Sequence, residues 1–276
     1  MSKPRKIGHL ISVGPRTLED FTRLGIKTIS KLAQQNPHAL YKKLCKITQI
    51  RHDPCVEDVF AAAIAQAQDV NLPEEQKHWA YWSAVRKIRP RRCAWVTLGN
   101  ITYEHYHDTE WGVPVHDDKI FYEFLVLEGA QAGLSWETIL KRRDAYQEAF
   151  ADFDWHKVAK YDQSKINQLL TSSHIIRNRA KILSAINNAQ CFERVRQEFG
   201  SFDNYVWQFV RCSPLQTHRK NISEIPTSSA ESQALSKDLK RRGFSFVGPT
   251  VMYAFMQATG LINDHTCDCF RYKELI

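Results

Sequence analysis

One carboxylate stands on an otherwise apolar helix face, where its chemistry would be unusual. Phe121, Phe124 and Leu125 follow one another at the spacing of a single helix face, and Glu128 takes the next position on it. Burying an unpaired carboxylate costs roughly 2–5 kcal/mol, so something must compensate it. Three interpretations are open: a functional carboxylate, a buried salt bridge, or a helix end that frays at the nearby glycines and lets the side chain reach water.

Aromatic side chains gather around that stripe. Trp95, Tyr103, Tyr106 and Trp111 fall within 17 residues, and Trp136 follows. Proteins use flat rings to sandwich an unstacked nucleic-acid base, at ~1–3 kcal/mol per base. The alternative interpretation is a large aromatic core.

Cysteine and histidine side chains suggest a metal site. Cys93 and His107 lie far from His265 and Cys269 in the chain, and together they offer two thiolates and two imidazoles. This is a tetrahedral zinc set without an open position, which indicates a structural site. The long gap from residue 107 to residue 265 is not a zinc-finger spacing, so unrelated buried cysteines and surface histidines are the alternative. Cys267 is a rival ligand to Cys269.

Two short segments have the form of a tight turn that leads into a helix. They are Phe-Val-Gly-Pro-Thr at 246–250 and Val-Gly-Pro-Arg-Thr at 13–17. Backbone N–H groups at the start of the following helix can hold a DNA phosphate. One such turn is weak evidence because many helix pairs turn this way, but two in one basic chain favour DNA contact.

Positive charge is concentrated in the first third of the chain. The 276 residues include 38 Lys and Arg against 30 Asp and Glu, a net charge of +8. Residues 1–90 hold 15 basic and 8 acidic side chains, net +7, so +1 is left for residues 91–276. This distribution favours a polyanionic partner, with plain solubility as the alternative.

Composition excludes several classes of protein. Hydrophobic residues make up 43% and charged residues 25%, which excludes wholesale disorder and collagen-like repeats. No uncharged apolar run approaches the ~18 residues of a membrane span, and no apolar signal core follows the charged N-terminus. Seven cysteines, an odd number, favour reduced thiols or a metal site in the cytoplasm.

Periodicity and capping residues predict an all-α chain in two parts. Residues 1–88 read as a module of short helices with a linker, and residues 89–276 as a larger helical domain. Predicted helix starts are Thr28, Asn36, Pro54, Asp162, Arg177, Asp203 and Ser229. In addition, Ser135 is predicted to cap one helix over 136–150, and Pro249 to begin the last helix, over 249–258.

From about Arg91 to Tyr272 the chain resembles the DNA-3-methyladenine glycosylase I family. The matching motifs are RCAWV (92–96), YHDTEWGVP (106–114), LEGAQAGLSW (127–136), SEIPT (223–227), RGFSFVG (242–248), and NDH (263–265) with Cys269. The resemblance implies a divergent helix-hairpin-helix DNA glycosylase. Such an enzyme flips N3-methyladenine out of alkylated DNA and hydrolyses its N-glycosidic bond, a step of base excision repair.

The resemblance also implies roles for individual residues. Glu128 would hydrogen-bond the flipped base with help from Tyr106, and Trp136 would stack on it. Pocket-lining roles fall to Trp95, Tyr103 and Trp111. The DNA-binding hairpin would include Val247, Gly248 and Thr250. One structural Zn²⁺ per chain would be held by Cys93, His107, His265 and Cys269.

These residue types suit the chemistry. Methylation at N3 gives adenine a positive charge and makes it a good leaving group, so a desolvated carboxylate and aromatic faces complement it. Asn263 stands near the place where related hairpin glycosylases carry an Asp, and adjacent Asp264 precedes the implied ligand His265. We therefore expect no separate catalytic Asp and a monofunctional enzyme without lyase activity.

Two departures from the family accompany this resemblance. His174 replaces an expected Gly, which would be strained if the turn there needs a positive φ. The segment from Gly8 to Trp82 is extra, and it resembles the pathogenicity-locus family, another helix-hairpin-helix module. We predict auxiliary DNA binding for it; a protein-interaction or merely stabilising module is the alternative. Cys45 and Cys55 in this module are predicted to be buried thiols, with metal binding as the alternative.

Two rival functions remain for the whole chain. One is a non-catalytic DNA-damage-binding protein on a glycosylase scaffold, and the other is a structural zinc protein with a protein partner. Retention of Glu128, Tyr106 and Trp136 favours the enzyme. We expect a monomer that acts on double-stranded DNA with alkylated bases, without membrane association, in the cytoplasm with the nucleoid.

Overall fold

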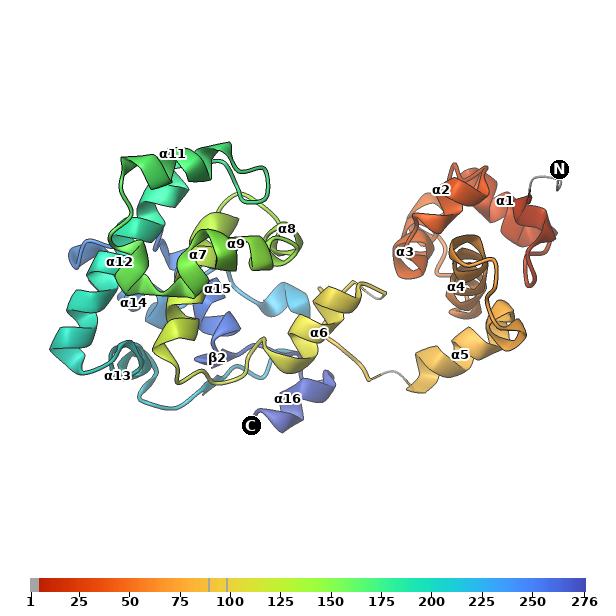
Figure 1. Ribbon diagram of the computed structural model, residues 1–276. Coiled ribbons are helices and arrows are strands. Elements are labelled where there is room, and N and C mark those ends of the chain that lie inside the picture. Colours follow the sequence, from red (N-terminus) through yellow and green to blue (C-terminus); the bar gives the residue numbers. More distant parts are fainter. Residues whose placement is uncertain (1–4, 89, 98) are drawn as a thin grey trace. The chain divides into compact units, whose positions relative to one another are not determined.

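The protein is described by a computed structural model covering residues 5–88, 90–97 and 99–276. Helices form two compact units, one made of residues up to 91 with 96–104, the other of 92–95 with 105–276 (Figure 1). The domain boundary expected at 88/89 adjoins Arg89, which lies outside the described residues. Strands among the described residues are two residues long, so the all-α prediction is confirmed. No helix in the described ranges is long and apolar enough to cross a membrane.

The first unit packs short helices around one core. Its helices are α1 (Pro15–Arg23), α2 (Ile29–Ala33), α3 (Pro37–Thr48), α4 (Cys55–Gln68) and α5 (Trp79–Ile88), with 3-10 turns at Ile7–His9 and Glu74–Lys77. Thr28 and Asn36 cap α2 and α3 by accepting backbone N–H groups, as predicted. Phe21, Leu32 and Phe60 are fully buried in the core. Cys45 and Cys55 are only half-buried, so the prediction of two buried thiols was wrong.

The second unit contains most of the remaining helices. They are α6 (Ile101–Thr109), whose first residues group with the first unit, α7 (Asp118–Gln131), α8 (Trp136–Leu140), α9 (Arg143–Ala149), α10 (Trp155–Val158), α11 (Gln163–Thr171), α12 (Arg179–Phe199), α13 (Phe202–Trp207), α14 (Ala230–Arg241), α15 (Pro249–Ala258) and α16 (Phe270–Glu274). Short 3-10 turns occupy Ala151–Phe153, Gln208–Val210 and Ile222–Glu224, and β1 (Leu215–Gln216) pairs in parallel with β2 (Ile262–Asn263).

Helix α7 forms the centre of this unit (Figure 1). Its side chains are buried almost continuously from Phe121 to Ala130, because α12, α13 and α15 pack around it. Phe121, for example, lies 5.8 Å from the ring of Phe202 and 6.0 Å from that of Phe255. A helix buried on most sides holds its polar side chains in fixed, dry surroundings.

Three details differ from the sequence predictions. The helix expected over 136–150 is broken: Arg142, at φ −111° and ψ 3°, separates α8 from α9, and its guanidinium donates to the His174 carbonyl at 3.2 Å. Helix α15 is not the last, since α16 follows it. His174 is not among the left-handed residues, so the turn there carries no strain of that kind.

Candidate active site and metal centre

Glu128 lies in the last turns of α7 and is 3% exposed. Its Oε2 atom is buried and has no hydrogen-bond partner among the described residues. The salt-bridge and frayed-end interpretations were therefore both wrong, since α7 continues to Gln131 and no Lys or Arg in the described part of the chain is paired with the carboxylate. Desolvation raises the pKa of Glu128 to about 8. A carboxylate that is buried and unpaired in this way is available to a ligand that carries positive charge or a hydrogen-bond donor.

The end of α7 is held by a residue that the sequence analysis missed. Lys181, in the first turn of α12, donates to the carbonyl oxygens of Ala130 and Ala132, each at 2.7 Å. These carbonyls lack helical partners because α7 ends there. A lysine is well suited to this place, where the helix dipole is negative. The Lys181 ammonium group is thus hydrogen-bonded to the end of α7, just beyond Glu128. No spacing pattern in the sequence predicts this contact between α12 and α7.

Two of the predicted pocket residues form one cluster with the Glu128 helix. The rings of Tyr106 and Trp136 lie 5.3 Å apart, and Trp136 stacks on Phe124 at 6.3 Å with an interplanar angle of 19°. Phe124 is one turn before Glu128 on the buried face of α7. Trp136 Nε1 is a second buried polar atom without a partner among the described residues. The cluster thus combines flat rings with two unused polar atoms.

The remaining predicted pocket residues are placed differently. Trp95 lies 5.0 Å from Trp111 and 6.5 Å from Tyr106, so it joins the same aromatic cluster. Trp111 is buried and its ring also contacts that of His265 at 4.6 Å, which makes it a wall of the metal cluster as well. Tyr103 is half-buried and belongs to the 96–104 segment that groups with the first unit. Its place in the pocket stays a prediction.

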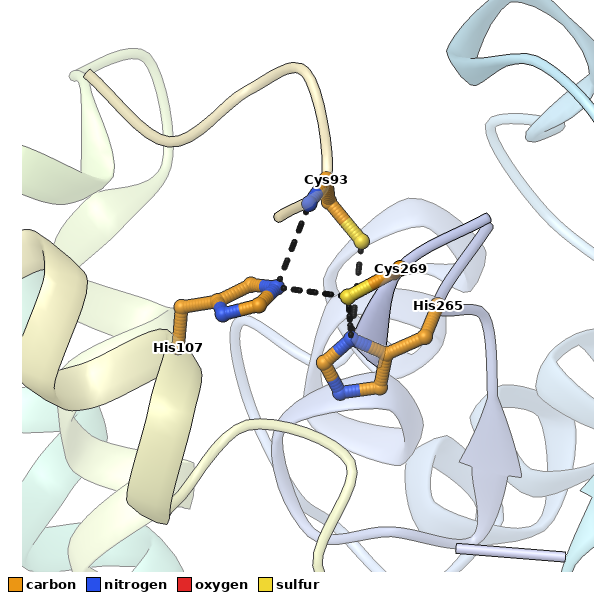
Figure 2. Close-up of side chains that lie close together, drawn as sticks. All are labelled: Cys93, His107, His265 and Cys269. Atoms are coloured by element: carbon orange, nitrogen blue, oxygen red, sulfur yellow. Dashed lines mark hydrogen bonds between the residues drawn. The ribbon is translucent and has the colours of Figure 1, made fainter. Parts of the chain in front are cut away.

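The four predicted metal ligands come together and are all buried (Figure 2). Their ligand atoms lie within 4.8 Å of one another. The sulfur-to-nitrogen distances are 3.4 Å from Cys93 to His265 Nδ1, and from Cys269 to both His107 Nε2 and His265 Nδ1. A tetrahedral zinc ion at ordinary bond lengths would separate such atoms by about 3.5 Å. Cys267 is only half-buried and is not in this group.

The outward nitrogen of each histidine is already bound. His107 Nδ1 lies 2.8 Å from Asp108 Oδ1, and both oxygens of Asp108 in turn accept hydrogen bonds from the Arg92 guanidinium. His265 Nε2 lies 2.9 Å from the Trp111 carbonyl oxygen. These contacts direct His107 Nε2 and His265 Nδ1 inward, the arrangement of metal-bound histidines. The donor set therefore fits one zinc ion without an open position.

One hydrogen bond between the two cysteines shifts the pKa values of their thiols in opposite directions. The hydrogen bond between Cys93 and Cys269 is the largest cause that lowers the pKa of Cys269, and it raises the pKa of Cys93. A thiolate therefore forms easily at Cys269, and the thiolate is the form that binds a metal.

The predicted DNA-binding hairpin adjoins the helix that carries Glu128. Phe246 has φ +57°, Gly248 is the N-cap of α15, and Thr250 is exposed in its first turn. Val247 is buried, and its carbonyl accepts a hydrogen bond from Ser236 at 2.6 Å. A side chain at Gly129 would begin 3.6 Å from Phe246 Cβ. The hairpin is therefore packed directly against the residue that follows Glu128.

Asp264 is held by hydrogen bonds rather than poised as a base. It is fully buried and accepts hydrogen bonds from Thr217 Oγ1 at 2.6 Å, Tyr253 Oη at 2.5 Å and Gln257 Nε2 at 2.7 Å. Both carboxylate oxygens are engaged by these donors. Such a network favours a structural role at the turn that leads to His265.

A surface hollow of about 790 Å³ lies elsewhere on the second unit. Aromatic and charged side chains of α12, α13 and α14 line it, with the Arg242 guanidinium over the rings of Phe199 and Tyr205. It contains none of the predicted site residues. We therefore place the candidate site at Glu128, whose buried Oε2 atom lacks a hydrogen-bond partner among the described residues, and not at this hollow.

Comparison with known proteins follows the two units. A family model described as methyladenine glycosylase matches residues 95–272, and one described as pathogenicity locus matches residues 2–88. DNA-3-methyladenine glycosylase 1 of Escherichia coli (strain K12) is 48% identical over 181 residues, 66% of this chain and 96% of that protein. The mitomycin resistance protein McrB of Streptomyces lavendulae is 32% identical over 78 residues, 28% of this chain and 70% of that protein.

Solved structures agree with the larger match. The crystal structure of a 3-methyladenine DNA glycosylase I has a TM-score of 0.64 at 46% identity, over 65% of this chain and 98% of the other. The structure that describes 3-methyladenine recognition by the Staphylococcus aureus enzyme has a TM-score of 0.63 at 38% identity, over 65% and 95%.

Proposed function

The chain belongs to the methyladenine glycosylase family, and we propose that it excises N3-methyladenine from alkylated double-stranded DNA. The observation that carries the proposal is the buried Glu128 carboxylate, with its unpartnered Oε2 atom. It lies on the helix whose Phe124 stacks on Trp136, and Trp136 in turn contacts the ring of Tyr106. A cationic, flat base supplies the positive charge that this site lacks, together with a π-face that can stack on its aromatic rings. Neutral adenine would leave the charge of the carboxylate less well compensated.

The proposed reaction is hydrolysis of the bond between C1′ and N9. The base leaves with the electron pair of that bond, which neutralises its positive charge and gives 3-methyladenine. Water supplies the new oxygen at C1′ and releases one proton to solvent. Because the substrate is already cationic, the site needs no strong acid; it extrudes the nucleotide, holds the base and admits water.

Each proposed residue has a limited task. Glu128 hydrogen-bonds the flipped base and favours its positive charge while the nucleotide is bound. Tyr106 assists from α6, and Trp136 provides a stacking face. Trp95 and Trp111 are proposed to line the pocket, and the same role is assigned to Tyr103 from the family resemblance alone. No Lys is assigned as a nucleophile, and Asp264 is engaged in its own hydrogen bonds, so the proposed enzyme is monofunctional.

One structural Zn²⁺ ion is proposed for Cys93, His107, His265 and Cys269, because the distances and the bound outer nitrogens fit it. An ion there would cross-link the two ends of the second unit and leave no position for substrate. The ion supplies stability, and the chain's own side chains perform the base recognition.

The proposed division of labour follows the two parts of the chain. Residues 89–276 are the glycosylase domain, with Val247, Gly248 and Thr250 in its DNA-binding hairpin. Residues 1–88 are an auxiliary DNA-binding module, supported by its charge of +7 over residues 1–90 and by its own Val13-Gly14-Pro15 turn. We propose a monomer that works on cytoplasmic, nucleoid DNA.

Base release from methylated duplex DNA tests the function. The protein should release 3-methyladenine, identified by chromatography, and Glu128→Gln should release it at least about 100-fold more slowly, since a lost catalytic interaction of 2.7 kcal/mol or more is expected. Glu148→Gln, the same change at an exposed position of α9, is the matched control. No release by folded protein would instead support the damage-binding alternative, in which alkylated duplex is bound without turnover.

A further inference from the structure

The two turns singled out in the sequence follow the same backbone course. Ser12 at φ +68° and Phe246 at φ +57° are both left-handed, although neither is glycine. Each is followed by valine and by a glycine that caps a helix, Gly14 for α1 and Gly248 for α15. Proline occupies the first turn of both helices. The likeness therefore extends from sequence to backbone conformation.

In both turns, a buried amide grips the residue before the left-handed one. The Ser245 N–H donates to Asn188 Oδ1 at 2.8 Å, and Asn188 Nδ2 donates to the Ser245 carbonyl at 2.9 Å. The Ile11 N–H likewise donates to Gln66 Oε1 at 2.9 Å, and Gln66 Nε2 donates to the Ile11 carbonyl at 3.0 Å. Asn188 and Gln66 are each 3% exposed. We call this double hydrogen bond an amide clamp.

The clamps reach their turns from opposite directions along the chain. Asn188 lies in α12 and precedes Ser245 by 57 residues, whereas Gln66 lies in α4 and follows Ile11 by 55 residues. The two clamps are thus not equivalent positions of an internal repeat. In both units, however, an amide holds the same residue of the turn, the one before the left-handed residue.

A carboxamide is the uncharged side chain that can meet the N–H and the C=O of one residue together, because it offers a donor and an acceptor. Left-handed backbone at a side-chain-bearing residue costs of order 1–3 kcal/mol and persists where surrounding contacts over-determine it. Without the clamp, the turn would sample other conformations, and DNA binding would have to order it. The clamp thus settles the shape before DNA arrives.

In the second unit the clamp also fixes how the hairpin meets the pocket. Phe246 directly follows the clamped residue and packs against Gly129, the neighbour of Glu128. The Ser236 hydroxyl fixes the Val247 carbonyl from the other side. Shifting Ser245 would therefore move the hairpin relative to the helix that carries the carboxylate.

We propose that Asn188 and Gln66 are positioning residues, which hold the two hairpins in the shape that binds the DNA backbone. The inference rests on the proposed function, since it assumes that these hairpins contact DNA. Asn188 acts through Ser245 and Phe246 and touches no base. Gln66 acts through Ile11 and Ser12 in the first unit.

Asn188→Leu in the full chain is the first test. Leucine keeps the size and removes both hydrogen bonds, so affinity for a duplex with one alkylated base should fall about tenfold, equivalent to 1.4 kcal/mol. Affinity for free 3-methyladenine should stay within twofold of wild type. Ser184→Ala is the control, because this buried hydroxyl on the same helix bonds within α12, to the Lys181 carbonyl. Equal losses for duplex and free base, or no loss, would overturn the inference.

Asn188→Asp covers the case in which the leucine variant does not fold. Its ionised carboxylate can accept from the Ser245 N–H but cannot donate to the carbonyl, whereas its protonated form can do both. Because position 188 is buried, desolvation should raise the pKa of the new carboxyl above its ordinary value. The duplex affinity, relative to wild type at each pH, should therefore be reduced at pH 8 and recover toward pH 5. A constant ratio across this range would contradict the clamp.

Two further variants separate the inference from the function beneath it. Thr250→Glu places a negative charge at the hairpin itself; if it leaves duplex affinity unchanged, the hairpin does not bind DNA and the proposed interface fails with the inference. If it weakens binding while Asn188→Leu does not, only the inference fails.

Gln66→Met tests the clamp of the first unit. It should weaken binding to undamaged duplex about threefold, equivalent to about 0.6 kcal/mol. Gln68→Met, a change at an exposed residue of the same helix, is the control and should leave this affinity unchanged.

Discussion

At the scale of single residues, the chemistry depends on when Glu128 is ionised. Desolvation alone raises its pKa, and no described cation opposes the shift. A bound cationic base acts in the opposite direction, because an opposite charge nearby favours the carboxylate. In the proposed function, the carboxyl group is therefore mostly protonated before the base binds and forms an ion pair with the bound cationic base. Such a site would select for charge on the base as well as for its shape.

The activity of the free enzyme should depend on pH through this group. The pKa of Glu128 is raised to about 8, so the ionised fraction increases as pH rises through that value. We expect kcat/KM for 3-methyladenine release to climb with pH, with its midpoint at about 8 and a plateau about one pH unit higher, since this parameter reports ionisation of the free enzyme. Glu128→Gln should lack the rising limb. A wild-type profile that is flat from pH 6 to 9 would contradict the role of Glu128 as the ionising group.

At the scale of elements, the turn between α15 and β2 fixes the approach to the metal cluster. Gly260 has φ +70°, and a Cβ there would lie 2.3 Å from the backbone nitrogen of Pro114. The chain continues from this turn through β2 to Asp264 and His265. The backbones at Gly260 and Pro114 must therefore lie in close contact so that His265, near the end of the unit, can reach His107, near its beginning.

Gly260→Ala should destabilise the protein strongly. Both the left-handed backbone and the backbone clash oppose a side chain, so we expect a loss of at least about 3 kcal/mol in the free energy of unfolding. Gly200→Ala is the control: Gly200 also has a positive φ, +84°, but its nearest neighbour would be a flexible amide at 3.5 Å. That change should cost about 1–2 kcal/mol. Denaturant titration measures both, and similar costs would refute the clash argument.

The metal cluster joins α6, the 92–95 segment and the loop before α16, so its occupancy should govern their stability. We expect one zinc ion per chain by elemental analysis, and loss of that ion in Cys93→Ala with a fall of several kcal/mol in unfolding free energy. Cys212→Ala, which changes an exposed free thiol, should leave both quantities unchanged. A metal-free protein of full stability would refute the structural zinc ion.

Features set by neighbouring residues were predictable from the sequence, and features set by distant ones were not. Thr28 and Asn36 cap their helices as predicted, because the groups that they bind lie within three residues. The break at Arg142 was missed because its guanidinium bonds to a segment more than thirty residues away. The Asn188 clamp was missed for the same reason. The metal cluster could be assigned only through family resemblance, since its spacing has no local periodicity.

At the scale of the whole molecule, the charge of the first unit should affect how strongly salt weakens DNA binding. Each phosphate contact adds about 0.9 to the slope of log affinity against log salt. Deleting residues 1–88 should therefore make that slope shallower by about 1 or more, while the choice of base stays the same, because phosphate contacts carry no base information. An unchanged slope would favour a protein-interaction or stabilising role for the module.

The four clustered ligands also set an order of events during protein synthesis. Cys93 and His107 leave the ribosome long before His265 and Cys269, and 269 − 93 = 176 residues separate the outer pair. At 5–20 residues per second, about 9–35 seconds pass before the cluster can close. During that interval the first unit can fold, but Cys93 and His107 still lack the other two ligands of the cluster, His265 and Cys269. A nascent chain stalled before residue 265 would therefore hold an unfinished second unit, open to proteases and chaperones, beside a first unit that has already folded.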